Sequence, residues 1–529
     1  MKNMKKTYFM LLLSCLFTLT TQAKKENDPR LIIITFDGLR WQELFTGADS
    51  SLVGNKTFVE KPEVLRSKYW RESQDERRKL LMPFTWSYIK DNGFMVGNRN
   101  IGSQMQVANK KNYSYPGYSE NFCGYPDDER VDSNDPIPNH NRSVFEVANQ
   151  DPRYHNNLMV YGSWESIRYA VNNERGGFKA SASYEKNVSS KQDATMQLLD
   201  EMLDGMPHIW GEERFDAFTY AYALQTLKND HPKVMWISFG DTDEWAHDGR
   251  YDFYLDAING TDKFIKRIVE TCEADPFYKG KTTYMLTCDH GRGYAKAFTS
   301  HGARTKGSQN TWFMVFGKGI EPLGETSSNG PFYNQQVAAT VANVLGIDFT
   351  PDNGVKQQPI DPHYKGVPLE EDVLYKDCGY FPAVEATPAG NGVKYAYYEG
   401  KFKSVDHLND APILETGTLN NFSIKGAKVD DHFGYTFETL LKIPVSGKYI
   451  LSLSSDDGSK LWIDDKLVAD NDGSHSYGSE DIIIEFEAGY HRVFVKYFED
   501  TEECGLNIGL NGCGINVDNI PDDMLFLAK

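Results

Sequence analysis

Three apolar segments of the sequence each run into residues that could bind a metal ion. The segments are Leu31–Phe36, Val234–Phe239 and the stretch from Lys281 to Cys288. Carboxylates and imidazoles follow the segments closely, and a last histidine comes twelve residues after Asp289. The residues are Asp37, Asp243, His247, Asp289, His290 and His301. Mixed Asp and His ligands favour zinc over magnesium or calcium, which bind oxygen almost exclusively.

The three segments are predicted to be buried parallel strands, because each is short and apolar without alternation. Ligands of open α/β sheets sit beyond the carboxyl ends of the strands, so these side chains are expected to meet there. Each residue alone also has a structural explanation, since Asp before Gly is common in turns and a buried His is often only a hydrogen-bonded core residue. The same pattern at several strand ends favours a metal site.

Ser114 is the candidate nucleophile, within Asn112-Tyr-Ser-Tyr-Pro-Gly-Tyr-Ser119. A serine before an aromatic-Pro-Gly sequence is expected in a sharp, non-helical turn that exposes its hydroxyl. The alternatives are an ordinary tyrosine-rich loop, or Ser119 as the nucleophile. Residues 121–142 form a loop too long for an idle connection, so they are expected to line the site, with Asn139 and Asn141 as candidate amide donors to a substrate.

The fold class is predicted to be α/β, with a mixed, mostly parallel sheet flanked by helices, followed by an all-β domain. Strands and helices alternate between residues 30 and 347, which assigns residues 24–347 to one catalytic domain. Residues 348–389 are rich in Pro, Gly and charge and are expected to be a linker. Residues 390–529 contain short alternating strands separated by turn sequences, which indicates an antiparallel sandwich.

The N-terminus predicts export. Residues 1–23 have a basic start, an apolar run and a small residue, Ala23, at the expected cleavage site, as in a secretory signal peptide. An alternative is lipoprotein processing at Cys15. No other segment is long enough for a transmembrane helix. The net charge of −19 argues against a nucleic-acid polymer as a partner, because such a surface repels phosphate backbones.

The spaced set of Asp37, Ser114-Tyr-Pro116, Asp243-x-x-x-His247, Asp289-His-Gly291 and His301 resembles the alkaline phosphatase superfamily, most closely its nucleotide pyrophosphatase/phosphodiesterase branch. The resemblance covers roughly residues 30–347. It implies two zinc ions and a serine nucleophile that forms a phosphoseryl intermediate. By position, Asp243, His247 and His301 would bind one zinc ion, and Asp37, Asp289, His290 and the Ser114 oxygen the other.

The sequence also departs from that family. Gly117 stands where the family has an asparagine, which is why Asn139 and Asn141 are considered instead. A sulfatase motif would need Arg at position 118, which is Tyr. Near Tyr161-Gly-Ser-Trp-Glu165 there is no Lys-Asp-Arg element of the kind that contacts the extra charge of a phosphomonoester. A phosphodiester or pyrophosphate is therefore the preferred substrate class, with a phosphomonoester as the alternative.

Residues 390–515 resemble the protective-antigen-type β-sandwich domain, through Ser455-Asp-Asp-Gly-Ser-Lys-Leu-Trp-Ile-Asp464 and Tyr497-Phe498. Some members bind sugars through calcium held by an Asp pair, which here would be Asp456 and Asp457. The alternative is a structural turn, which Asp-Asp-Gly suits without a metal. The resulting hypothesis is an exported two-zinc phosphoric-ester hydrolase with a carbohydrate-binding domain. The competing hypothesis is a sugar-binding surface protein without catalytic activity.

Overall fold

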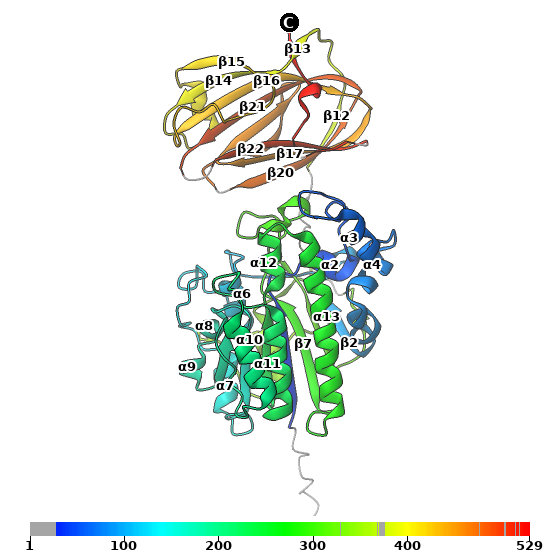
Figure 1. Ribbon diagram of the computed structural model, residues 1–529, viewed down its shortest axis with the longest axis vertical. Helices are drawn as coiled ribbons and strands as arrows, with labels where there is room; N and C mark the ends of the chain where they lie inside the picture. Colours follow the sequence, from blue (N-terminus) through cyan, green and yellow to red (C-terminus); the bar gives the residue numbers. More distant parts are fainter. Residues whose placement is uncertain are drawn as a thin grey trace, which may run out of the picture. The chain divides into compact units, whose positions relative to one another are not determined.

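The chain forms two compact units, Met1–Glu370 and Glu371–Lys529. The computed structural model (Figure 1) describes residues 28–327, 330–367, 369, 376–475, 477–501, 504–513, 515–517 and 519–529. The expected signal peptide, and Cys15 with it, lies outside the described residues. Within the described part of the chain, no helix combines the length and the apolar composition that crossing a bilayer requires.

The first unit contains a mixed eight-stranded sheet in the order β10-β2-β9-β7-β1-β6-β4-β5. Its strands are β1 (Arg30–Phe36), β2 (Gly93–Val96), β4 (Leu158–Gly162), β5 (Lys179–Ala182), β6 (Val234–Phe239), β7 (Thr282–Cys288), β9 (Phe313–Gly317) and β10 (Gly324–Glu325). Only β9 runs antiparallel to its neighbours, β2 and β7. A small second sheet contains β3 (Met105–Gln106), β8 (Asn310–Thr311) and β11 (Phe332–Tyr333).

Helices cover both faces of the large sheet because its central strands are apolar on both sides. In β1, Ile32 and Ile34 belong to one buried cluster and Leu31 and Ile33 to the other. The first cluster is covered by α2 (Trp41–Thr46), α3 (Pro62–Tyr69), α4 (Gln74–Leu81), α10 (Ala194–Gly205), α11 (Asp216–Asn229), α12 (Asp241–His247) and α13 (Tyr251–Ala274). The second is covered by α6 (Ser114–Cys123), α7 (Val144–Gln150), α8 (Ile167–Ala170) and α14 (Gln336–Leu345).

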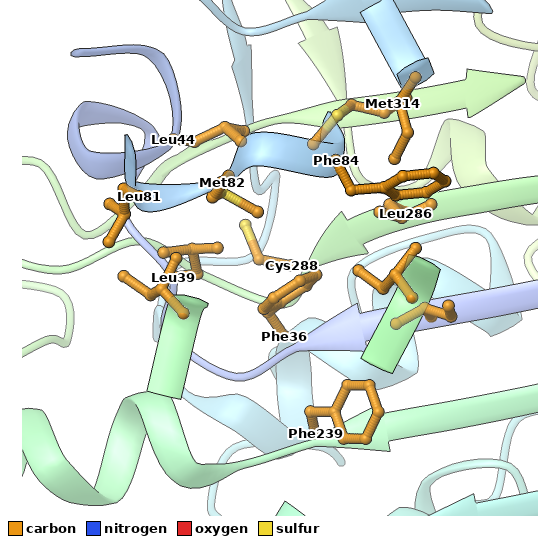
Figure 2. Packing of buried hydrophobic residues seen from close by; sticks show 14 of the residues in the cluster. Phe36, Leu39, Leu44, Leu81, Met82, Phe84, Phe239, Leu286, Cys288 and Met314 are labelled. Carbon is orange, nitrogen blue, oxygen red and sulfur yellow. The ribbon is translucent and has the colours of Figure 1, made fainter. Parts of the chain in front are cut away.

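Three central strands end at the same level. In the register of β1 with its neighbours, Phe36 is paired with Phe239 of β6 and with Cys288 of β7. These three residues end in the same apolar core, where Figure 2 shows them with Leu286 and Met314. The chain segments that follow the three strands therefore leave the sheet together.

Apolar spacing predicts helices over residues 192–204, 214–228 and 251–273, and these correspond to α10, α11 and α13 with ends that differ by at most two residues. The segment from Leu80 to Asn92 is also predicted to be helical, but it is not one helix. It consists of the end of α4, a π-helical turn at Thr85–Ile89 and the short α5 (Lys90–Asn92).

The second unit is an all-β structure with two sheets. One has the order β12-β20-β17-β22-β23. The other is built around β13-β24-β16-β21-β18-β19, with β14 paired to β16 and β15 paired to β14. Alternating sequence predicts strands at 393–398, 434–441, 448–453, 460–463, 481–486 and 491–498. They correspond to the longer strands β14 (Val393–Glu399), β16 (Phe433–Ile443), β17 (Gly447–Asp456), β18 (Ser459–Ile463), β20 (Gly478–Phe486) and β21 (Gly489–Glu499). Sequence analysis missed β12 (Lys376–Phe381), β13 (Pro388–Asn391), β15 (Glu415–Leu419), β19 (Lys466–Asn471), β22 (Gly505–Gly512), β23 (Ile515–Val517) and β24 (Leu525–Ala528).

The two units confirm the predicted fold class, an α/β region followed by an all-β region. The segment expected to be a linker, 348–389, is packed at both ends. Phe349 and Ile360 belong to a core cluster of the first unit, and β12 pairs with β20 in the second. The Pro and Gly content of this segment indicated a linker. The same composition also occurs in irregular chain that packs against a core, so composition alone does not distinguish the two.

Candidate metal centre and active site

Asp37 and Asp289 meet where β1 and β7 end. The Oδ1 of Asp289 accepts a hydrogen bond from the backbone N–H of Gly38 (3.1 Å), and the Oδ2 of Asp37 accepts one from the hydroxyl of Tyr118 (3.2 Å). The Oδ2 of Asp289 is buried and has no hydrogen-bond partner. Burial, together with the adjacent charge of Asp37, raises the pKa of Asp289. Two buried carboxylates this close favour a cation between them.

His290 directs its Nε2 atom into this group of carboxylates. That nitrogen lies 3.4 Å from the Oδ1 of Asp37 and 3.4 Å from the Oδ2 of Asp289. Its Nδ1 is 2.7 Å from the carbonyl oxygen of Gly291, which fixes the ring. Burial lowers the pKa of His290, but Asp289 and Asp37 outweigh it and raise this pKa to about 9.

Ser114 is the first residue of α6, and its Oγ points at the same group. This Oγ lies 3.1 Å from the Nε2 of His290 and 3.3 Å from the Oδ1 of Asp37. The expected non-helical turn is therefore wrong. Pro116 does not prevent the helix, because a proline in the first helical turn has no N–H bond to lose. Gly117 allows α6 to approach β7, since a Cβ atom there would collide with the backbone oxygen of Asp289.

Asp243, His247 and His301 form the adjoining part of the site. Asp243 and His247 are one turn apart on α12, with 3.0 Å between the Oδ2 of Asp243 and the Nε2 of His247. The Nε2 of His301 lies 3.0 Å from that of His247, and its ring stacks on His290 with centroids 3.9 Å apart. Burial and the neighbouring charges of His290 and Arg292 keep the pKa of His301 well below its usual value, so its ring is a neutral donor.

The structure brings all seven predicted metal ligands together. Ligand atoms of Asp37, Asp289 and His290 lie within 4.8 Å of one another, and so do those of Asp243, His290 and His301. The unpartnered Oδ2 of Asp289 and the two imidazole Nε2 atoms of His247 and His301, which face each other at 3.0 Å, fit a metal ion. Carboxylate oxygens and imidazole nitrogens grouped in this way are expected to bind a metal ion, and this combination of donors suits zinc.

Sequence analysis missed Arg292, which lies directly after the Asp289-His290-Gly291 motif. Its guanidinium is completely buried and donates to Asp243, and its Nη2 donates to the backbone oxygen of Thr299 (2.7 Å). Burial lowers the pKa of Arg292 to about 9. Arg292 thus ties α12 to the segment that carries His301. A fully buried arginine in an acidic cluster was not detectable from spacing, although its position next to the motif was a usable signal.

The structure does not bring Asn139 and Asn141 to the site as free amide donors. The amide of Asn139 donates to the Oγ of Ser119 (2.9 Å) and to the backbone oxygen of Ala170 (2.8 Å). Asn141 bonds to Tyr125, Arg130 and Asp127. These hydrogen bonds organise the loop internally. Ser119, the alternative nucleophile, is buried and accepts the bond from Asn139, away from the seven ligands.

A different asparagine of the same loop reaches the start of α6. The Oδ1 of Asn134 accepts a hydrogen bond from the backbone N–H of Tyr115 (3.0 Å), the residue after Ser114. The backbone oxygen of Asn134 accepts one from Ser166 (3.2 Å). Asn134 is exposed to solvent. The long loop thus contacts the nucleophile's helix, as its length indicated, but through a residue that the sequence did not single out.

The second unit has its own carboxylate group. Ligand atoms of Asp456, Asp457 and Glu499 lie within 4.8 Å of one another. Glu499 is fully buried, and its Oε1 has no hydrogen-bond partner. Asp457 accepts backbone N–H bonds from His475 (2.6 Å) and Asp500 (2.7 Å). Glu499 adds a third oxygen donor to the Asp pair that the sequence indicated.

Two family models match the chain, one in each unit. Residues 215–348 match the Metalloenzyme superfamily. Residues 390–523 match the PA14 domain. The first match includes Asp243, His247, Asp289, His290 and His301, and it supports a metal-dependent enzyme. No curated protein matches the chain in sequence.

Solved structures resemble the chain only distantly. A putative sulfatase from Bacteroides thetaiotaomicron is 12% identical with a TM-score of 0.40, over 65% of this chain and 76% of that one. The lipoteichoic acid synthase LtaP from Listeria monocytogenes is 12% identical with a TM-score of 0.38, over 61% and 72%. An anti-sigma factor domain-containing protein is 18% identical with a TM-score of 0.23, over 26% of this chain and 48% of its own length. At these TM-scores the similarities carry no information about activity.

Proposed function

We propose that the first unit is a two-zinc hydrolase of phosphoric esters that uses Ser114 as its nucleophile. The observation that carries this proposal is the position of the Ser114 Oγ, 3.1 Å from the Nε2 of His290 and 3.3 Å from the Oδ1 of Asp37. A serine hydroxyl with only a structural role at the start of a helix would not require a position among side chains that could bind metal ions. The match to the Metalloenzyme superfamily supports the same reaction class.

Seven side chains would hold the two ions. Asp243, His247 and His301 would bind one, and Asp37, Asp289, His290 and the Ser114 oxygen the other. His290 belongs to both observed ligand groups, so its assignment to one ion follows the sequence resemblance. When bound, the zinc ions would supply positive charge that makes the serine hydroxyl acidic and stabilises charge on the phosphoryl oxygens.

The proposed reaction has two steps. The Oγ of Ser114 attacks phosphorus and its proton passes to Asp37, to which the hydroxyl donates. The bond to the leaving oxygen breaks, the leaving group departs with the electron pair and takes a proton from solvent, and a phosphoserine remains at position 114. Water then attacks this phosphoserine and releases the phosphate product together with the free hydroxyl. In the structure the Ser114 hydroxyl donates to Asp37, which orients Oγ before attack. Asn134 would offer its side-chain amide to a non-bridging oxygen, since its carbonyl is already held by Tyr115.

The preferred substrates are phosphodiesters or pyrophosphates. The sequence lacks a Lys-Asp-Arg element near Tyr161–Glu165, so no extra cation is assigned to the second charge of a monoester. A phosphomonoester is the alternative substrate. Sulfate esters are disfavoured, because the position where sulfatases need Arg holds Tyr118, which is buried and hydrogen-bonded to Asp37.

The second unit is proposed to bind glycans with a calcium ion at Asp456 and Asp457. The match to the PA14 domain supports a carbohydrate-binding role. The unpartnered Oε1 of buried Glu499 supports a cation there, because calcium takes carboxylate oxygens. Together with the signal-like residues 1–23, this indicates an exported enzyme that would act near glycans. The remaining alternative, a sugar-binding protein without activity, would not need the Ser114 geometry.

The proposal is tested with zinc-loaded full-length protein on chromogenic phosphodiester, phosphomonoester and sulfate ester substrates with the same leaving group. We expect the highest kcat/KM for a phosphodiester. A preference for the monoester would select the alternative substrate. Hydrolysis of the sulfate ester alone would overturn the phosphate proposal. No turnover of any ester, with both zinc ions bound, would support the sugar-binding alternative.

A further inference from the structure

A second group of carboxylates lies beside the metal centre and shares no residue with it. Glu213 precedes α11, Asp216 is the first residue of α11, and Asp241 is the first residue of α12. One oxygen of each lies within 4.8 Å of the others. Glu213 is 4% exposed and Asp216 is 2% exposed, so these are interior groups and not a solvated acidic surface.

Hydrogen bonds fix Asp216 and Asp241 in place. The Oδ1 of Asp216 accepts bonds from the backbone N–H of Gly240 (2.7 Å) and the hydroxyl of Ser163 (2.7 Å). Asp216 and Asp241 also exchange bonds, each backbone N–H donating to the other side chain at 2.8 Å and 3.2 Å. Their carboxylates are therefore held in one orientation before any ligand arrives.

Glu213 contributes an oxygen that nothing in the described chain satisfies. Its Oε1 is buried without a hydrogen-bond partner. A Cβ atom on Gly240 would collide with this oxygen, so Oε1 lies against the backbone of the residue whose N–H holds Asp216. The unpartnered atom thus lies beside Gly240, directly before Asp241, and one carboxylate oxygen of Glu213 is within 4.8 Å of the other two acids.

Among the described residues, the only basic side chain found to interact with these three acids is Arg214, which interacts electrostatically with Asp216 without forming a salt bridge. Arg214 directs its guanidinium to Thr219, Ser181 and the backbone of Glu185. Glu244, also in the first turn of α12, is a fourth acid: it raises the pKa of Glu213 and shares a side-chain hydrogen bond with it. Buried carboxylates without a cation are costly, so a positive ion or shared protons must compensate them.

A cavity reaches two members of this group, Asp216 and Asp241. It has a volume of about 240 Å³, and its other lining residues include Trp245, Phe253, Asp256 and Phe264. A hydrated divalent ion could enter through this cavity and keep part of its water shell there.

We propose that Glu213, Asp216 and Asp241 bind a hard divalent cation, Mg²⁺ or Ca²⁺. All three donors are carboxylate oxygens, which these ions prefer. The group contains none of the nitrogen donors that are typical of zinc sites. The ion would fix α12, because Asp241 and the zinc ligand Asp243 lie on its first turn and Thr242 between them bonds to the backbone oxygen of Asp37. The proposal does not depend on which ester the enzyme hydrolyses.

The test uses full-length, zinc-saturated protein carrying Asp457→Asn and Glu499→Gln, which inactivate the carboxylate group of the second unit. Equilibrium dialysis against Mg²⁺ and against Ca²⁺ should show one bound equivalent of one of them in addition to zinc. The preferred ion distinguishes the two candidates. Absence of any bound equivalent of either ion would overturn the proposal without reference to further variants.

Replacing Glu213 then locates the ion. Glu213→Gln in the same background should lower the affinity at least tenfold and leave the zinc content unchanged. Terbium provides an independent readout, because excitation of Trp245 in the cavity wall should sensitise Tb³⁺ bound to Asp216 and Asp241. Unchanged affinity and unchanged terbium emission in a folded Glu213→Gln protein would show that the ion binds elsewhere and that shared protons compensate the cluster. If Glu213→Gln does not fold, Asp241→Asn takes its place in the same comparison.

Discussion

The Oγ of Ser114 lies 3.1 Å from the Nε2 of His290, at the point where α6 begins. The two residues are 176 positions apart in the chain. Their contact places the proposed nucleophile among the metal ligands, and it is the basis of the first prediction.

Ser114→Ala should abolish ester hydrolysis and leave the zinc content unchanged. Loss of a nucleophile costs on the order of 10³-fold or more in kcat. Ser119→Ala is the matched control, because it removes a buried hydroxyl from the same helix without touching the ligands. The measurement is kcat on the preferred ester, with zinc determined by elemental analysis. If Ser119→Ala loses activity and Ser114→Ala keeps it, Ser119 is the nucleophile and the assignment to Ser114 is wrong.

Asp289→Asn should lower the zinc content by about one equivalent and abolish activity. The substitution removes the charge of a fully buried carboxylate whose Oδ2 has no other partner. Asp348→Asn, at a side chain that is 86% exposed, is the control for a loss of charge alone. Chelation of the wild type should give the same loss, and added zinc should reverse it. Full activity in excess chelator would rule out a metal-dependent mechanism.

Arg292→Lys should weaken zinc retention and lower kcat/KM about tenfold, equivalent to about 1.4 kcal/mol. Lysine keeps the charge but cannot hold Asp243 and the backbone of Thr299 together with a planar fork. Zinc release to a competing chelator is the decisive readout. If release is as slow as in wild type, Arg292 does not position the ligands through Asp243.

Asn134→Ala should raise KM and lower kcat/KM several-fold with zinc content unchanged. The side chain is exposed and borders the N-terminus of α6, so its removal should not disturb the core. Asp135→Ala is the control from the same loop. Steady-state kinetics on the preferred ester measures KM and kcat/KM for both variants. Equal kinetics for both variants would remove Asn134 from the substrate-binding group.

Calcium binding by the second unit should strengthen as the pH rises to about 8. Burial, opposed by a hydrogen bond from Tyr497 and reinforced by Asp457 and Asp456, raises the pKa of Glu499 from 4.5 to about 8. A proton on Glu499 competes with calcium below that pH. Without calcium, the pH dependence of the free energy of unfolding has the opposite sign. Between pH 4.5 and 8 the native state binds more protons than the unfolded state, because the pKa of Glu499 is raised in the native state. The free energy of unfolding therefore falls as the pH rises through that window.

Thermal unfolding with and without calcium at pH 5 and pH 9 measures both effects. Calcium should stabilise the second unit more at pH 9. Glu499→Gln should remove the difference between the two pH values, because glutamine does not titrate. A calcium effect of the same size at both pH values in the wild type would show that Glu499 is not a ligand.

The sequence indicated the parallel strands because their apolar runs are uninterrupted, and the residues after β1, β6 and β7 followed from that placement. The helices α10 and α13 were predictable for a different reason, their apolar periodicity, which is weaker in α11. The edge strands of the second unit, such as β13 and β15, are short and largely exposed, and thus carry no apolar pattern.

The errors within the site have a common physical cause. Asn139 and Asn141 were chosen by residue type, but the direction of a side chain in a long loop is set by hydrogen bonds that the sequence does not specify. Asn134 was overlooked for the same reason. The Ser114 turn was predicted from Pro116, although the first turn of a helix accepts proline. Arg292 and Glu213 owe their roles to burial, which no local pattern showed.

The hydrogen bond from Gly38 to Asp289 joins two residues that are 251 positions apart. During synthesis the ribosome releases Asp37 long before Asp289 and His301, so neither of the two proposed zinc sites can be complete until most of the first unit exists. On this proposal, metal binding would follow synthesis of most of the unit. Fragments that end before His301 should be unable to carry both ions.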